Sequence, residues 1–111
     1  MPTAALLALA DDTRLGIVEA LAGDDRSVTE LVELFPISQP AISRHLRLLR
    51  DAGVVTSTAV GKQRIYRLNP VALREVSSWA DQCTKRWEAR FDALGSHLNV
   101  MKTRKEQHRA R

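Results

Sequence analysis

Residues 37–53 read ISQPAISRHLRLLRDAG, and this stretch carries the signals of one short helix. Ser38 is placed to cap the helix start, since its hydroxyl can accept a free main-chain N–H of the first turn. Pro40 fits the first turn, where its missing N–H costs nothing. Gly53 supplies the stop. The sequence therefore predicts a helix that begins after Ser38 and runs until Gly53.

The two faces of this predicted helix differ in chemistry. At 100° per residue, one face is apolar and carries Ile42, Leu46 and Leu49. The opposite face is polar and cationic; it carries Pro40, Ser43, Arg44 and Arg47, with Asp51 at its far end. The apolar face is expected to pack on the rest of the chain, which leaves the cationic face exposed. His45 lies beside Leu49 and is interpreted as a partly buried packing residue.

Three shorter helices are predicted before this stretch. Residues 4–10 are rich in Ala and Leu, and Asp11 or Asp12 can cap a second helix that runs to about residue 22. In that helix Leu15, Val18 and Leu21 recur at helical spacing. Residues 27–30, Ser-Val-Thr-Glu, have the form of a capping box, followed by Leu31 and Leu34. This third helix is brief, because Phe35-Pro36 interrupts it.

The pattern changes after Gly53. Residues 54–58 are mostly β-branched, Gly61-Lys62 indicates a turn, and residues 64–68 alternate as a returning strand. Asn69-Pro70 then repeats the cap-then-proline start, and a long helix is expected to about Met101. The fold class is mainly α with a small β-hairpin: a winged helix-turn-helix of about five helices and a two-stranded wing.

This arrangement suits double-stranded DNA, because the major groove admits one α-helix and a hairpin tip can reach a flanking phosphate or the minor groove. The predicted DNA-binding residues lie on the helix face and the hairpin; they are Ser38, Gln39, Pro40, Ser43, Arg44, Arg47, Lys62, Gln63 and Arg64. Thr13 and Arg14 lie at a helix start and have two alternative roles: they contact a phosphate of the DNA, or they cap the helix.

The charge distribution fits a DNA partner. The chain has 111 residues, which is the size of one domain. Its formal net charge of +4 permits a polyanionic partner. Residues 1–36 hold two basic and seven acidic side chains, residues 37–67 hold six basic and one acidic, and residues 68–100 balance. The last eleven residues have a net charge of +4. We expect a DNA-binding and dimerisation domain over residues 1–101 and a basic, disordered tail over residues 102–111.

Several classes of protein are disfavoured. One cysteine cannot form an internal disulfide or a zinc knuckle. The apolar stretch at residues 4–10 is far shorter than the roughly 20 residues that span a bilayer, and it lacks the basic region of a signal peptide, so a cytoplasmic protein without membrane contact is expected. The sequence shows no nucleophilic residue next to an acid/base pair that could activate it, so neither an enzyme nor a bound cofactor is predicted.

Several segments together resemble the ArsR-type winged-helix repressors. These are residues 8–14 (ALADDTR), 37–49 (ISQPAISRHLRLL), 52–55 (AGVV) and 66–68 (YRL), and they occur in the family's order over roughly residues 4–100. The ending at residues 87–94, WEARFDAL, is similar to a subgroup without metal ligands. The resemblance implies a homodimer that binds an operator, with the first and last helices in the dimer contact.

The sequence departs from the metal-sensing pattern of that family. Residues 27–34 precede the recognition helix and offer no thiol, where many members have a cysteine pair. The long helix contains Asp81, Cys83, Asp92 and His97, without the short spacing that a shared four-ligand site needs. Metal sensing is therefore not supported, and the effector stays unidentified.

The long helix carries an apolar stripe that a body this small cannot cover alone. With the first helix it gives the predicted dimer interface: Leu6, Leu7, Trp79, Cys83, Trp87, Phe91, Leu94 and Leu98. Two further alternatives are not decided by the sequence. One is a cavity between two such helices that admits a small apolar effector, and the other is a redox role for Cys83. The alternative function is a protein-interaction module that uses this helix and has little affinity for DNA.

Overall fold

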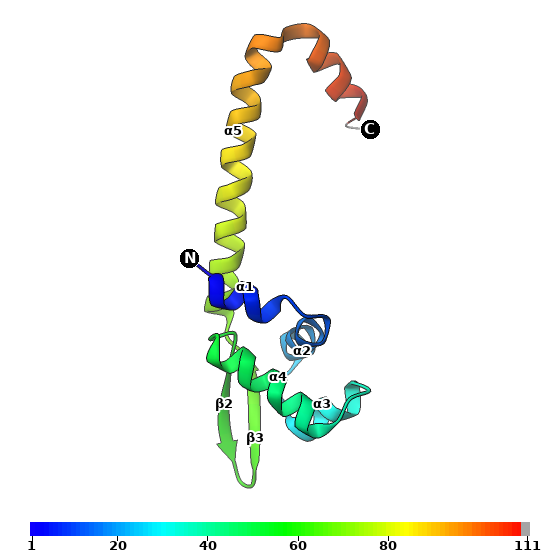
Figure 1. Cartoon of the computed structure of the whole chain (residues 1–111), viewed down its shortest axis with the longest axis vertical. Helices are drawn as coiled ribbons and strands as arrows, with labels where there is room; N and C mark the ends of the chain where they lie inside the picture. Colours follow the sequence, from blue (N-terminus) through cyan, green and yellow to red (C-terminus); the bar gives the residue numbers. More distant parts are fainter. Residues whose placement is uncertain (110–111) are drawn as a thin grey trace. The chain divides into compact units, whose positions relative to one another are not determined.

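The computed structural model describes the main chain of residues 1–109 and the side chains of residues 1–95. The chain divides into two compact units, Met1–Ser77 and Ser78–Arg111. In chain order the elements are α1 (Thr3–Leu9), α2 (Asp12–Gly23), β1 (Arg26–Ser27), α3 (Val28–Leu34), α4 (Gln39–Asp51), β2 (Val55–Val60), β3 (Gln63–Leu68) and α5 (Pro70–Arg109) (Figure 1). The mainly helical fold with a small β-hairpin is confirmed.

The predicted helix starts are confirmed by their caps. The Asp11 carboxylate accepts a hydrogen bond from the main-chain N–H of Arg14 at 3.0 Å, so Asp11 rather than Asp12 caps α2. The Ser38 hydroxyl accepts one from the main-chain N–H of Ala41 at the start of α4. Asn69 does the same for α5, where its side-chain oxygen accepts from the N–H of Val71.

The capping box at the start of α3 is complete. The Ser27 hydroxyl accepts from the main-chain N–H of Glu30 at 3.2 Å, and the Glu30 carboxylate accepts from the main-chain N–H of Ser27 at 3.0 Å. The hydrogen bond from the Ser27 main chain, helped by its hydroxyl, holds the pKa of Glu30 below its usual 4.5. Because the folded pKa is lowered, this contribution to stability is present above about pH 4.5 and is lost as the pH falls through the folded value.

We expect Ser27→Ala to lower the free energy of unfolding by about 1 kcal/mol, because it leaves an N–H of the first turn of α3 without its acceptor. Urea unfolding at neutral pH measures the loss. Thr29→Ala is the matched control, since Thr29 is exposed in the same turn and has no capping role. Equal losses in the two variants would contradict the assignment.

The predicted two-stranded wing is confirmed, and a third, short strand completes its sheet. β2 and β3 form the antiparallel hairpin, with Val55 opposite Leu68 and Val60 opposite Gln63. β1 pairs with the other edge of β3, which gives the order β1-β3-β2. β1 has only two residues, too few for a periodic pattern, so it could not be predicted from the sequence. Gly61, at the hairpin turn, has φ +63°, a conformation that favours glycine.

One apolar core joins α1 to α4, the hairpin and the start of α5 within residues 1–77. Its fully buried large side chains are Ile17, Leu31, Ile42, Leu46, Leu49, Val54 and Val55. Two leucines that share helical spacing with buried residues are themselves exposed: Leu15 by 42% and Leu34 by 51%. Each lies at the margin of its helix's apolar stripe, and in these short helices only the centre of the stripe reaches the core.

A glycine in α2 sets how the turn after α3 packs. A Cβ added at Gly16 would lie 2.9 Å from Cε1 of Phe35, closer than packed carbon atoms approach. Phe35 ends α3 and begins the turn to α4. The absence of a side chain at Gly16 therefore lets the helix-turn-helix corner rest on α2.

The last helix continues to Arg109, beyond the expected end near Met101. After Gly95 the sequence contains no glycine or proline, and it is rich in the good helix formers Lys, Arg, Glu and Gln. The division into a domain over residues 1–101 and a disordered tail over residues 102–111 stays a prediction, and residues 110–111 lie outside the described chain. Among the described residues, no helix is long and apolar enough to cross a membrane.

Candidate nucleic-acid interface

The apolar face of α4 fixes this helix in the core. Ile42, Leu46 and Leu49 each have no exposed surface, as the sequence predicted. Their burial defines which side of α4 faces outward, because residues on a helix keep a fixed angular relation to one another. The cationic side of the helix is thereby presented on a supported element rather than on a loop.

The predicted DNA-binding residues at the start of α4 and along it are all exposed; they are Ser38, Gln39, Pro40, Ser43, Arg44 and Arg47. The Ser38 hydroxyl is already an acceptor for the helix start. Within the described part of the chain, neither Arg44 nor Arg47 has a hydrogen bond or ion pair to another residue, so both guanidinium groups are available to an external partner.

The hairpin provides a second group of exposed polar side chains. Lys62 lies in the turn between β2 and β3, and Gln63 and Arg64 follow at the start of β3 (Figure 1). Nη1 of Arg64 donates to the Ser57 hydroxyl at 2.9 Å across the two strands. This contact holds the Arg64 side chain along the hairpin and leaves its other N–H groups for a phosphate.

One cation of the basic segment is paired inside the fold. Nε and Nη2 of Arg67 each lie 3.0 Å from Oδ2 of Asp25. The pair joins β3 to the segment before β1 and offsets one positive charge of residues 37–67 with one negative charge of residues 1–36. The contrast between the acidic and basic segments is therefore smaller in the fold than along the sequence.

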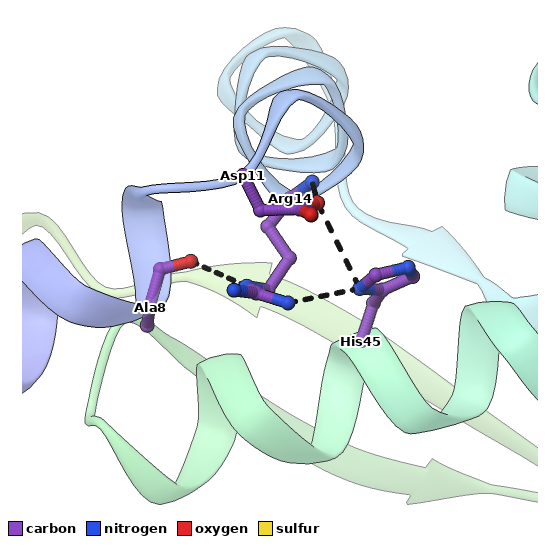
Figure 2. A network of polar contacts seen from close by, with 4 residues as sticks. All are labelled: Ala8, Asp11, Arg14 and His45. Atoms are coloured by element: carbon purple, nitrogen blue, oxygen red, sulfur yellow. Dashed lines mark hydrogen bonds and ion pairs between the residues drawn. The ribbon is translucent and has the colours of Figure 1, made fainter.

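A polar network lies between α4 and the neighbouring helices α1 and α2 (Figure 2). Nε of Arg14 donates to the main-chain oxygen of Ala8, and Nη1 of Arg14 lies 3.2 Å from Nδ1 of His45. Oδ2 of Asp11 lies 3.9 Å from the same ring nitrogen. The main-chain N–H of Arg14 lowers the pKa of Asp11 below its usual 3.8. Arg14 is thus committed to internal contacts, and His45 is half-buried, as expected of a packing residue.

Asn69 ties the hairpin to both neighbouring helices. Its side-chain amide donates to the main-chain oxygen of Gly53 at 2.9 Å, and its main-chain N–H donates to that of Val54 at 2.8 Å. Its side-chain oxygen accepts from Val71 in the first turn of α5. Gly53 has φ +78°, which ends α4 as predicted.

The residues predicted for a dimer interface fall in both units. In α1, Leu6 is half-buried and Leu7 is 68% exposed. In α5, Trp79, Cys83, Trp87 and Leu94 are exposed, whereas Phe91 is half-buried. The Trp87 and Phe91 rings stack with centroids 5.3 Å apart. Leu98 lies outside the residues whose side chains are described.

Among the described residues, no three His, Cys, Asp or Glu side chains come together as a metal site would require. Four groups of α5 were also weighed from the sequence as metal ligands: Asp81, Cys83, Asp92 and His97. The side chain of His97 lies outside the described residues.

The chain is similar to known regulators in sequence and in structure. The family model "Bacterial regulatory protein, arsR family" matches residues 11–57. The "HTH-type transcriptional regulator Rv2034" of Mycobacterium tuberculosis is 41% identical over 73% of this chain and 76% of that protein. The "Transcriptional repressor SdpR" of Bacillus subtilis is 36% identical over 65% of this chain and 80% of that protein. An "ArsR-like Transcriptional Regulator from Rhodococcus sp. RHA1" superposes with a TM-score of 0.76 and 30% identity, over 84% of this chain and 88% of that structure.

Proposed function

Because the chain belongs to the ArsR family of DNA-binding transcriptional regulators, we propose that it is a homodimeric repressor whose α4 and wing read a pseudo-palindromic operator. In this proposal two copies of α4 enter successive major grooves about 34 Å apart, and the bound dimer blocks a promoter. The protein acts in the cytoplasm, and the basic residues 102–111 add nonspecific affinity.

The observation that carries the proposal is the contrast between the two sides of α4. Leu46 is fully buried, while Arg44 and Arg47 are exposed and, in the described chain, unpaired. Unpaired arginines on a supported helix can donate in pairs to guanine edges or to phosphates. When these arginines bind DNA they lose side-chain conformational entropy, but the fold does not need to rearrange.

A fluorescence-anisotropy titration tests the proposal directly. The DNA upstream of the protein's own gene is compared with random DNA of the same length and salt concentration. We expect saturable binding to the upstream DNA that is at least about 10³-fold tighter than binding to random DNA. Equal affinities would overturn the proposal.

The wing is expected to contribute a phosphate contact rather than base readout. Lys62→Ala should reduce the slope of log affinity against log salt by about 0.9 for each lysine lost and leave operator preference nearly unchanged. Titrations between low and moderate salt measure this slope. Lys85→Ala removes the same charge from a residue paired with Asp81 on α5 and serves as control. A change in operator preference would show that Lys62 reads bases.

The dimer proposal is supported by the apolar surface of the single chain. Leu7, Trp87 and Leu94 are each more than half exposed, which is costly in water unless a partner covers them. The alternative, an interaction module, predicts a monomer with negligible DNA affinity. Sedimentation at micromolar concentration separates the two: a dimer with operator affinity supports the repressor, and a monomer without it supports the alternative.

A further inference from the structure

Arg14 connects three helices through one side chain. It lies in the first turn of α2, donates to the main-chain oxygen of Ala8 in α1, and contacts His45 in α4 (Figure 2). The His45 side chain is 21% exposed, and its neighbour in the chain is Arg44, on the face proposed to contact DNA. The contact between Arg14 and His45 therefore fixes the side of α4 opposite to the DNA.

The chemistry of the contact assigns the proton on His45. A guanidinium group only donates hydrogen bonds, so Nδ1 of His45 must be the acceptor at 3.2 Å. The ring is then neutral and carries its proton on Nε2. Protonation would place a second N–H on Nδ1, and it would set two cations against each other at this distance.

Protonated His45 has another partner within reach. Oδ2 of Asp11 lies 3.9 Å from Nδ1, and Asp11 is held in place because it caps α2. Arg14 and Asp11 are the charged groups that face His45 from the elements packed on it in the described chain. On α4 itself, Ala41 and Leu49 lie one turn away and carry no charge. A proton on Nδ1 would therefore favour pairing of His45 with Asp11 in place of the hydrogen bond from Arg14.

We propose that the hydrogen bond from Arg14 to neutral His45 positions α4 for operator binding, and that protonation of His45 breaks this bond and lowers operator preference as the pH falls. The inference rests on the proposed function. The dependence on protonation follows from the contact itself, because a proton on Nδ1 would leave no lone pair there to accept the hydrogen bond from Arg14. The bond is intact at the higher pH, where preference for the operator is greatest.

The test measures affinity for operator and for random DNA from about pH 5.5 to 8.5 at constant ionic strength. The ratio of the two affinities is the readout, because an added positive charge strengthens binding to any DNA. For the wild type we expect this ratio to fall about tenfold toward the acidic end. The double variant His97→Gln/His108→Gln keeps His45 as its one histidine and should show the same fall.

Two substitutions of His45 separate the proton from the packing. In His45→Asn the side-chain oxygen can still accept from Arg14 but does not titrate, so the ratio should match that of the wild type at pH 8.5 and stay level. His45→Leu removes the acceptor, so the ratio should be low at every pH. Circular dichroism and thermal unfolding confirm that each variant is folded.

The outcomes distinguish the inference from the function beneath it. If the wild type shows no operator preference at any pH, the proposed function fails, and the inference fails with it. If operator preference is present but has the same pH dependence in His45→Asn, or rises as the pH falls, only the inference is overturned. Nitrogen chemical shifts of the His45 ring add a direct check: at pH 8.5 the proton should be on Nε2, and a proton on Nδ1 would contradict the contact.

Discussion

The double variant Arg44→Ala/Arg47→Ala should bind the operator about 30-fold to 10⁴-fold more weakly for each half-site, because each half-site loses two bidentate arginine contacts worth about 1–3 kcal/mol apiece. Both side chains are exposed and, in the described chain, unpaired, so the free energy of unfolding should change by less than about 0.5 kcal/mol. Anisotropy titrations on operator and random DNA measure the first effect, and urea unfolding measures the second.

The double variant Arg74→Ala/Lys85→Ala is the matched control for these arginines. It also removes two positive charges per chain, and it takes them from exposed side chains of α5, a helix that is not proposed to contact DNA. We expect it to weaken binding to both DNAs slightly and equally. If the double variant also lost affinity equally for both DNAs, Arg44 and Arg47 would be phosphate contacts, and base readout would have to come from other residues.

Leu46→Ala should lower the free energy of unfolding by about 2–5 kcal/mol, since it leaves a cavity at a fully buried position of α4. That is a large share of the roughly 5–15 kcal/mol that stabilises a domain. Urea unfolding at a fixed protein concentration measures the loss, because a dimer is more stable at higher concentration.

Leu48→Ala provides the comparison within the same helix. Leu48 is 44% exposed, so its truncation removes less buried surface and should cost much less than the truncation of Leu46. Similar losses in the two variants would mean that α4 is rotated from the orientation described, and the face proposed to contact DNA would then be wrong.

The local features of the fold could be predicted from the sequence. The faces of α4 follow from the spacing of Ile42, Leu46 and Leu49, and the caps follow from side chains that bond to amides two or three residues away. Such interactions depend on neighbours in the chain, and their geometry is nearly the same in every helix. The exposure of the predicted DNA-binding residues follows for the same reason, although their contact with DNA stays a prediction.

The features that the sequence did not reveal join distant residues. The contact of Arg14 with His45 spans 31 positions and that of Arg67 with Asp25 spans 42, so neither has a local pattern. β1 consists of two residues that pair with Tyr66 and Ile65 of a strand much later in the chain. The exposure of Leu15 and Leu34 does not follow from their helical spacing, because spacing locates an apolar stripe but not how much of it a small core covers.

Asn69 bonds to both of the elements that we propose contact DNA, α4 and the hairpin. It holds the peptides at the end of α4 and before β2 through Gly53 and Val54, follows the last residue of β3, and caps the first turn of α5. One residue therefore links the end of α4, the end of the hairpin and the start of α5, and it is not among the residues proposed to contact DNA. A rotation of the first turn of α5 would therefore move α4 and the wing together, because all three are held by Asn69.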